Sequence, residues 1–489
     1  MPNVPIQLDD PSLWRCDAFI DGGWVSARSD QRFSVEDPAT GKIIARVADL
    51  GAADVQLAVD AAATAFDTWR ATSAQDRAAC LFRWVDEIRR NREDLARILS
   101  LEVGRSMLES RNEIDYGVTF VQWFAEEARR VYGDTIPSPL PDRRFLVLKE
   151  PIGVVAAITP WNAPHSMVAR KCSPALAVGC PVVLKPAEQT PLSALALGVL
   201  AERAGFPKGV LNIVTTLDPV PAANVLTASE AVRKVSFTGS TEVGRILARD
   251  CAATLKKLSL ELGGNAPFIV FDDGDVDAAI EGAMQAKFRV IGQNCVGANR
   301  FYIHEALKDR FVTGFRDRMA ALRIGPPTEE AAQVGPVIDD AAVAKLTRLV
   351  SDAINKGSKL LLGGGVHPAG KCFFAPTLLT EVDPSMAIVH EEIFGPVATV
   401  QSFADEEAAI CAANATPYGL AAYFYTKDLR RAWRVAERIE VGMVGINVGM
   451  MSSAVAPFGG IKQSGHGREG SRYGIEEFLE LKYVCVGGL

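Results

Sequence analysis

The sequence predicts an α/β protein that is built from more than one domain. The chain has 489 residues, whereas a single domain usually contains about 100–200 residues. Short apolar runs alternate with helical stretches from 151 to 262, and the same alternation returns from 263 to 460. Buried strands that alternate with helices are typical of a parallel, doubly wound sheet. We therefore expect two α/β domains, one after the other.

The first 150 residues differ from this pattern. Residues 1–50 contain short strand-like pieces separated by turn signals at 21–23 and 37–41. Residues 52–130 are rich in alanine and charge, and their amphipathic pattern predicts helices. Proline and aspartate cluster at 134–142, directly before the alternating run 145–149, which predicts a β-hairpin that projects from the body.

The strands of the two α/β segments are predicted from their apolar runs. In the first segment the examples are 154–158, 182–184, 210–214, 234–237 and 255–260. In the second they are 268–271, 300–303, 388–389 and 442–447, and a last strand-like stretch follows at 478–485.

Composition excludes several classes of function. The net charge is −7 with both signs interleaved, which does not favour nucleic acid or an anionic membrane as a partner. The nine cysteines are widely spaced without a C-x-x-C pair, and the five histidines do not cluster near them, so we expect no metal site and no disulfide framework. The first ten residues lack the features of a targeting signal, and no apolar run approaches the ~20 residues that span a bilayer. We expect a cytoplasmic protein.

Two segments carry candidate catalytic groups. Cys295 ends the run Gly292-Gln-Asn-Cys, where a loop or helix start can lower the pKa of a thiol, although an inert buried cysteine is the commoner case. Glu261 ends a predicted strand beside a Gly-Gly turn, where a carboxylate can act as a general base or lie in solvent.

Two further segments suit a nucleotide. Residues 237–244 predict a strand, a Gly/Ser turn and a helix start, which can bind a pyrophosphate, although a simple Ser N-cap explains the segment equally well. Lys185 and Glu188 follow a buried strand, where an acidic residue can accept hydrogen bonds from ribose hydroxyls. A solvated loop is the simpler alternative for these two residues.

Taken together, these segments resemble one family in order and spacing. The chain resembles the aldehyde dehydrogenase superfamily over essentially its whole length. The matching motifs are Pro160-Trp-Asn162, Lys185-Pro-Ala-Glu188, Phe237-Thr-Gly-Ser240, Glu261-Leu-Gly-Gly-Asn265, Gly292-Gln-Asn-Cys295, Glu391-Glu-Ile-Phe-Gly-Pro396 and Pro457-Phe-Gly-Gly460. Seven ordered motifs make a chance match very improbable, and they favour a reactive Cys295 over an inert one.

The resemblance implies three parts. A Rossmann-like domain for NAD would comprise 1–130 and 151–262, and an α/β catalytic domain would comprise 263–465. A small β oligomerisation arm would combine 131–150 with 466–489. In this family two subunits share sheets through that arm, so the resemblance implies a homodimer or homotetramer.

The resemblance also implies a role for each motif residue. Cys295 would be the nucleophile, Asn162 and the Cys295 N–H the oxyanion hole, and Glu261 the base that activates water for thioester hydrolysis. The implied cofactor contacts are Trp161, Lys185, Glu188, Gly239, Ser240, Leu262, Glu392 and Phe394. A carboxylate at Glu188 should repel a 2′-phosphate, so we expect NAD rather than NADP.

Within the superfamily the chain is most similar to the succinate-semialdehyde dehydrogenases, on residues 126–137, 237–245, 260–272 and 465–483. That resemblance implies a carboxylated small-molecule aldehyde as substrate, bound by Arg170, Arg289 and Ser452 of the Ser452-Ser453 pair. A buried carboxylate needs such donors. The usual alternative for either arginine is a surface ion pair.

Three positions depart from the family pattern. Gly297 stands where many relatives have a second cysteine, so a regulatory disulfide with Cys295 is not expected. Asn294 stands where Thr is common, and 163–166 differ from the usual Phe-Pro run, which leaves His165 as a helix-start residue or a polar contact. These changes leave glutarate semialdehyde, or an uncharged aliphatic or aromatic aldehyde, as alternative substrates. Two other classes also stay open: a non-catalytic relative and a cofactor-free thiol hydrolase.

Overall fold

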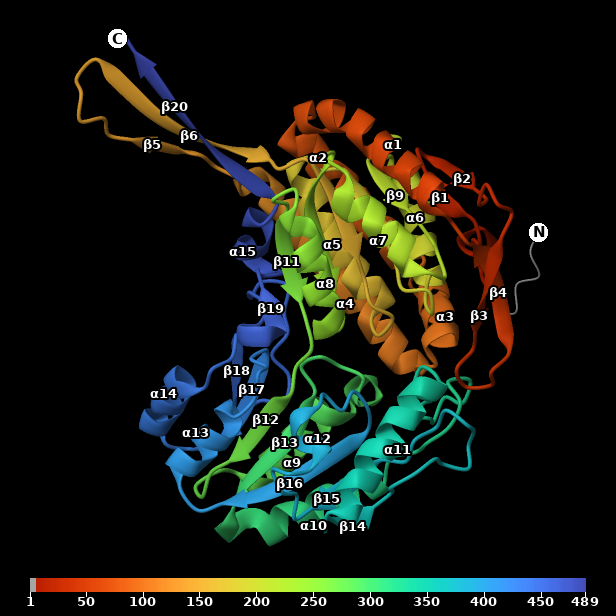
Figure 1. Cartoon of the computed structure of the whole chain (residues 1–489), viewed down its shortest axis with the longest axis vertical. Coiled ribbons are helices and arrows are strands. Elements are labelled where there is room, and N and C mark those ends of the chain that lie inside the picture. Colours follow the sequence, from red (N-terminus) through yellow and green to blue (C-terminus); the bar gives the residue numbers. More distant parts are fainter. Residues whose placement is uncertain (1–5) are drawn as a thin grey trace.

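The computed structural model describes residues 6–489, which form two lobes and a projecting arm (Figure 1). Met1–Pro5 lie outside the described residues. They form half of the ten-residue stretch that we expect to carry no targeting signal. The described residues form sheets of eight, seven, three and two strands. This arrangement, with helices on both faces of the two large sheets, confirms the predicted α/β class.

The eight-stranded sheet has a parallel centre with antiparallel edges. Its order is β19 (Gly465–His466), β11 (Lys257–Glu261), β10 (Val232–Thr238), β7 (Val154–Ile158), β8 (Val182–Lys185), β9 (Leu211–Ile213), β1 (Ala18–Ile20) and β2 (Gly23–Val25). The chain runs outward from β7 to β9 and then returns to build β10 and β11 on the other side. The order therefore reverses between β7 and β10, and such a switch point is where open α/β sheets bind ligands.

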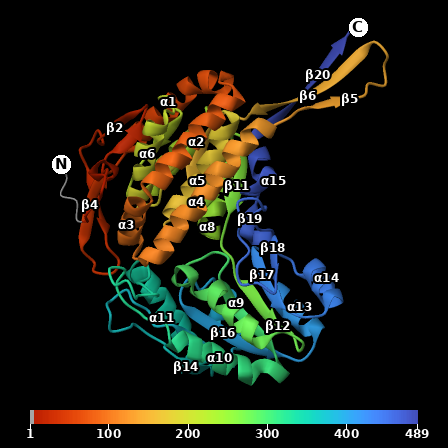
Figure 2. The same cartoon turned by 180° about the vertical axis from the view of Figure 1, so that it is seen from behind.

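Helices cover both faces of this sheet (Figures 1 and 2). One face carries α1 (Ala52–Ala71), α7 (Pro219–Ala228) and α8 (Thr241–Ala252). The other carries α5 (Pro164–Val178) and α6 (Leu192–Ala204), under an outer layer of α2 (Ala74–Arg90), α3 (Arg92–Val103) and α4 (Met107–Glu127). The predicted helical region 52–130 is confirmed, and it ends in η2 (Ala128–Arg130). The N-terminal strand pieces are β1, β2, and the pair β3 (Arg32–Glu36) and β4 (Ile43–Ala48), after η1 (Pro11–Leu13).

The seven-stranded sheet forms the other lobe. Its order is β14 (Lys359–Leu362), β15 (Thr377–Thr380), β16 (Val397–Phe403), β13 (Ala298–His304), β12 (Ala266–Val270), β17 (Ala421–Tyr425) and β18 (Met443–Ile446), and all neighbours except β14 and β15 are parallel. One face packs on α9 (Val276–Phe288) and α10 (Lys308–Ala320), and the other on α13 (Glu406–Asn414) and α14 (Leu429–Arg438). The remaining elements are η3 (Arg289–Gly292), η4 (Glu305–Leu307), α11 (Asp340–Asn355), α12 (Ala387–His390), η5 (Lys462–Ser464) and α15 (Ser471–Glu476).

The arm is a three-stranded antiparallel sheet that projects from the first lobe (Figures 1 and 2). β6 (Arg143–Pro151) pairs with β5 (Asp134–Ile136) and, along its whole length, with β20 (Leu479–Gly487). The predicted hairpin is therefore confirmed, and the C-terminal strand is its third strand. The last segment is divided: β19 belongs to the eight-stranded sheet, α15 packs on α4 and α5, and β20 alone joins the arm.

One predicted strand is wrong. Ile388 and Val389 lie in the short helix α12, where both are buried against α11. Two adjacent apolar residues do not distinguish a buried helical turn from a strand, because each conformation can bury them. In contrast, the run 154–158 is a strand over the predicted residues. No helix among residues 6–489 is both long and apolar enough to cross a membrane.

Candidate active site

The candidate site lies where the carboxyl ends of strands in the eight-stranded sheet face the amino ends of strands in the seven-stranded sheet. β7 and β10 present their carboxyl ends, which continue into Trp161-Asn162 and Gly239-Ser240. From the other lobe come the segments before β13 and β16, which carry Cys295 and Glu392. Neighbouring parallel strands have their carboxyl ends on the same side of the sheet. Each lobe therefore brings two of its motifs to one end of its strands. The linker 262–265 crosses from β11 to β12 beside them.

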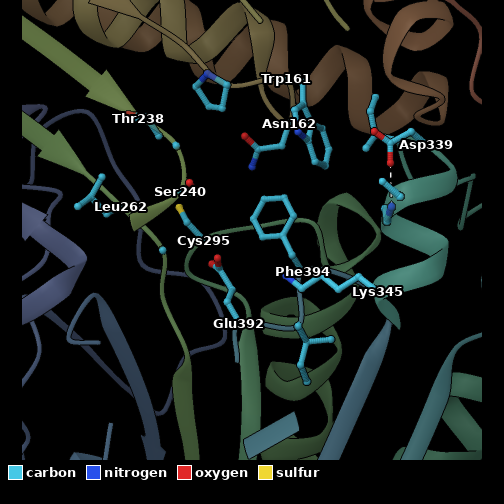
Figure 3. Close-up of a pocket in the computed structure, with 17 residues that line it drawn as sticks. Trp161, Asn162, Thr238, Ser240, Leu262, Cys295, Asp339, Lys345, Glu392 and Phe394 are labelled. Atoms are coloured by element: carbon cyan, nitrogen blue, oxygen red, sulfur yellow. Dashed lines mark hydrogen bonds between the residues drawn. The ribbon is translucent and has the colours of Figure 1, made fainter. Parts of the chain in front are cut away.

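A first cavity of about 350 Å³ lies over the β7–β10 switch point. In Figure 3, Trp161 and Asn162 lie on one side, Ser240 and Leu262 on a second, and Glu392 and Phe394 on a third, with Cys295 near Ser240. The Trp161 and Phe394 rings pack edge to face with centroids 5.4 Å apart. The structure therefore brings six of the eight predicted cofactor contacts together; they are Trp161, Gly239, Ser240, Leu262, Glu392 and Phe394.

Lys185 and Glu188 do not line this cavity. Lys185 is the last residue of β8, one strand beyond β7, and Glu188 follows it, with Lys185 Nζ 3.3 Å from the Glu188 carboxylate. Lys185 is buried, and burial lowers its pKa while Glu188 opposes that shift. The pair therefore lies at the carboxyl end of the strand next to β7, beside the cavity but outside its wall.

A second cavity of about 450 Å³ lies on the other side of Cys295. Asn162 and Cys295 line both cavities, so the thiol stands at the boundary between them. The second cavity is walled by α4, α5, η3 and the segment after β18, and all three predicted substrate contacts line it: Arg170, Arg289 and Ser452. The neighbouring Ser453 is exposed and is not part of the wall.

The two arginines of the second cavity differ in their partners. Arg170 is buried, with Nη2 2.7 Å from a Glu469 carboxylate oxygen and its guanidinium 4.0 Å from the Phe458 ring centroid. Arg289 forms no ion pair with the described residues and lies 5.9 Å from the Tyr116 ring centroid. The Tyr116 hydroxyl is itself buried without a hydrogen-bond partner among residues 6–489. Arg289 is therefore the cation that is available to an anion in this cavity.

The loop that carries Cys295 is strained and close-packed. Val290 and Ile291 have φ of 57° and 58°, a conformation that β-branched residues rarely adopt, and the Val290 N–H donates to Glu109 at 2.8 Å. A Cβ atom on Gly264 would lie 2.3 Å from the Cys295 carbonyl oxygen. Asn162 Nδ2 donates to the Gln293 carbonyl at 2.9 Å, which ties the loop to the end of β7.

The environment of Cys295 favours the thiol over the thiolate. Burial raises the pKa of Cys295 to about 12, although the Arg170 charge opposes this. The residue follows the 3-10 turn η3 and does not start an α-helix, so it lacks the helix-terminus stabilisation that often lowers a thiol pKa. The nearest polar side chain that contacts Sγ is Asn294, at 3.9 Å.

Glu261 is buried at the carboxyl end of β11, and neither of its carboxylate oxygens has a hydrogen-bond partner among the described residues. Burial raises its pKa well above the ordinary value, and the nearby charge of Glu469 adds to the shift. Burial would raise the pKa of Glu469 too, but Lys171, 2.6 Å away, and Arg170 hold it below the ordinary value. The charge of this buried cluster is therefore on Glu469, and Glu261 is held protonated.

The first cavity suits a nucleotide. Ser240 caps the N-terminus of α8, which faces it, and dipoles at such a terminus favour phosphate. Glu392 Oε1 accepts the Gly264 N–H at 2.9 Å and Oε2 accepts no hydrogen bond from the described residues, so it can accept one from a ribose hydroxyl. Among residues 6–489 there is no group of three potential metal ligands.

The α4 side of the second cavity was not identified from the sequence. Arg105, Glu109, Glu113 and Tyr116 line it, together with Met167 of α5. Glu109, Glu113 and Tyr116 are spaced to lie on one face of α4, and Arg105 lies in the turn before it, but the same spacing describes any amphipathic helix. His165 lies in the first turn of α5. It is fully buried, and burial lowers its pKa to about 3.

Comparison with known proteins agrees with this geometry. The model of the aldehyde dehydrogenase family matches residues 24–484. The chain is 54% identical to the 3-sulfolactaldehyde dehydrogenase of Pseudomonas putida, over 99% of both chains. It is 52% identical to the glutarate-semialdehyde dehydrogenase of Pseudomonas aeruginosa, over 99% of this chain and 100% of that one. It is 50% identical to an Escherichia coli protein named succinate-semialdehyde dehydrogenase [NADP(+)], with the same coverage.

Solved structures give the same result. The crystal structure of succinate-semialdehyde dehydrogenase from Burkholderia pseudomallei superimposes with a TM-score of 0.97 at 53% identity, covering 98% of this chain and 99% of that one. Fold, site and sequence thus define an oxidoreductase that uses a nicotinamide cofactor. The chain belongs to the aldehyde dehydrogenase family.

The raised pKa of Cys295 gives a testable pH dependence. Below its pKa the thiolate fraction of a thiol rises about tenfold per pH unit, so alkylation of Cys295 by iodoacetamide should keep accelerating from about pH 7 to about pH 10. A small free thiol with a pKa of about 8.5 should level off within that range. Peptide mass spectrometry measures the rate at Cys295, and the Cys295→Ser variant identifies its peptide. A plateau near pH 7 would show that burial does not control this thiol.

Proposed function

We propose that the protein oxidises an anionic aldehyde, with succinate semialdehyde as the first candidate, to the corresponding acid with NAD. The observation that carries the proposal is the position of Arg289, a cation without an ion pair in the cavity that Cys295 lines. A buried or half-buried arginine normally has an anionic partner. The substrate would place its aldehyde at Cys295 and its anionic end at Arg289, with Tyr116, Arg170 and Ser452 as further polar groups of the same wall.

The first chemical step is addition of the thiolate to the aldehyde carbonyl. The Cys295 sulfur forms a C–S bond, and the carbonyl oxygen takes the negative charge and then a proton, which gives a thiohemiacetal. One N–H of the Asn162 amide is used by Gln293, so the second is free for the oxygen. The Cys295 N–H, which no carbonyl of the described residues accepts, is the other donor.

Oxidation and hydrolysis follow. Trp161, Ser240 and Glu392 would hold the nicotinamide cofactor in the first cavity, where it would supply the acceptor for the hydride that leaves the thiohemiacetal, with release of one proton. Cys295 then carries the acyl group as a thioester. Glu261, after losing its own proton, takes a proton from water, whose oxygen attacks the thioester and releases the acid and the free thiol. Because its pKa is raised by burial, this step should accelerate as the pH rises.

The names of the relatives specify different anionic aldehydes: two are carboxylated semialdehydes and one is a sulfonated aldehyde. A guanidinium can bind either a carboxylate or a sulfonate through paired N–H groups. The alternatives are therefore glutarate semialdehyde and 3-sulfolactaldehyde. An uncharged aldehyde is disfavoured, because it would leave Arg289 desolvated without a partner.

The preference for NAD rests on Glu188. Its carboxylate lies at the end of β8, where it can accept hydrogen bonds from the adenosine ribose, and it would repel a 2′-phosphate. The name of the Escherichia coli relative specifies NADP(+), so NADP is the alternative cofactor. Lys185 is neutralised by Glu188 in this structure, so it does not by itself favour a phosphate.

A homodimer or homotetramer formed through the arm is also proposed. β20 and β6 carry exposed apolar side chains, among them Leu148, Leu481 and Tyr483, on a sheet that projects away from both lobes. Apolar groups exposed on a projecting sheet favour burial against another chain.

Replacing Arg289 tests the substrate class. In the Arg289→Met variant, kcat/KM for succinate semialdehyde should fall by about 100-fold or more, because a charge-assisted contact is lost, whereas the value for butyraldehyde should change by less than about threefold. A substrate panel with glutarate semialdehyde and 3-sulfolactaldehyde identifies the preferred anion. The control is Arg310→Met, which removes a surface arginine paired with Asp277. Equal losses for charged and uncharged aldehydes would reject the proposed anion contact.

Replacing Glu188 tests the cofactor. The wild-type enzyme should have a higher kcat/KM with NAD than with NADP, and Glu188→Ser should shift that ratio toward NADP by about tenfold, because the repulsion of the 2′-phosphate is removed. Glu202→Ser on α6 serves as a surface control. A wild-type preference for NADP, or an unchanged ratio in Glu188→Ser, would contradict the assignment.

A further inference from the structure

Arg105 occupies an unusual position for a buried arginine. It lies in the turn between α3 and α4, with 2% of its surface exposed, and its guanidinium donates to the backbone carbonyl of Asn162. The same guanidinium forms an ion pair with Glu113 of α4, which is also buried. Arg105 therefore contacts the residue whose side chain is the proposed oxyanion donor, but through its backbone.

Glu113 contacts the chain on the other side of Asn162. Its Oε1 accepts the N–H groups of His165 at 3.1 Å and Ser166 at 3.2 Å, at the start of α5. Its Oε2 pairs with Arg105. The Glu113 carboxylate thus caps the N-terminus of α5 and also neutralises Arg105, which binds the Asn162 carbonyl. Together, Arg105 and Glu113 fix both ends of the segment 162–166.

This fixation bears on the oxyanion hole. The Asn162 side chain has one protein partner, the Gln293 carbonyl, and its remaining N–H can be aimed at the reacting oxygen only if the backbone of Asn162 is fixed. Donors of this kind lose much of their effect when they move by a fraction of an ångström. A buried ion pair is weak evidence for stability in itself, because desolvation offsets its attraction. Its contacts with the residues around Asn162 offer a different reason for its presence.

We propose that Arg105 and Glu113 are positioning residues that hold Asn162 as the oxyanion donor; this rests on the proposed role of Asn162. Arg105 lines the second cavity, yet its guanidinium is already used by Glu113 and the Asn162 carbonyl. Arg289, in the same cavity, forms no ion pair with residues 6–489. The anion of the substrate therefore binds Arg289, and Arg105 acts on turnover rather than on substrate affinity.

Kinetics of three variants test the proposal. Arg105→Met should lower kcat by about 10- to 100-fold with the KM for the aldehyde within about threefold, and Arg105→Lys should recover part of the loss because it can still donate to Asn162. Glu113→Gln keeps an acceptor for the α5 N–H groups but removes the charge, and should also lower kcat. Arg111→Met is the matched control, since Arg111 lies on α4 and pairs with Glu93 at the surface, 2.9 Å away.

A double-mutant cycle with Asn162→Ala separates positioning from a general structural effect. Asn162→Ala should lower kcat, and adding Arg105→Met should cost less than about twofold more, because the donor that Arg105 positions is already absent. Melting temperature and the rate of Cys295 alkylation identify variants that are misfolded. A full additional loss in the double variant, or a rise in KM in place of a fall in kcat, would overturn the positioning role. A normal kcat for Asn162→Ala alone would reject the oxyanion role of Asn162 itself, and the proposal with it.

Discussion

The hydrogen bond from Asn162 to the Gln293 carbonyl, at 2.9 Å, joins the two large sheets at the site. Asn162 follows β7 of the eight-stranded sheet, and Gln293 precedes β13 of the seven-stranded sheet. The contact helps to place the thiol of Cys295 between two cavities, each of which is lined by residues of both lobes. Val290 and Ile291, just before Gln293, have backbone conformations that cost energy, so contacts of this kind are needed to hold the loop.

Burial is the second constraint on the site, and it acts on both proposed reacting groups. Cys295 and Glu261 both have raised pKa values, and burial is the largest cause in each case. The charge that the site does carry is on Glu469, and Arg170 and Lys171 neutralise it. Arg170 is therefore largely occupied inside the protein, and Arg289 is the group that we propose to select an anion.

The sequence predicts those parts of the site that lie in contiguous motifs. Asn162 and Ser240 follow parallel strands of the eight-stranded sheet and Glu261 ends another, so identifying these strands predicts that the three residues lie at the same end of the sheet. The helix at α12 could not be separated from a strand, because two apolar residues carry no periodicity. The ion pair of Arg170 could not be predicted either, since Glu469 lies about three hundred positions away in the sequence.

The α4 side of the second cavity could not be predicted from the sequence either. Arg105, Glu109 and Glu113 look like ordinary charges of an amphipathic helix, and solvent is the usual environment for such groups. Their burial follows from the outer helical layer, in which α4 lies on α5 and covers the start of that helix. No local pattern encodes that layer. Residues that act through backbone contacts with another segment are therefore the part of the site for which a structure is required.

In the proposed mechanism, Cys295 carries the acyl group and Glu261 activates the water that removes it. Intact-protein mass spectrometry of the Glu261→Gln variant, mixed with NAD and succinate semialdehyde, tests this most directly, because Gln cannot accept the proton of water. About one acyl group per chain should accumulate on Cys295, together with one equivalent of reduced cofactor, and slow hydrolysis should limit further turnover. Full turnover by this variant without an acyl adduct, or an adduct on another residue, would contradict it.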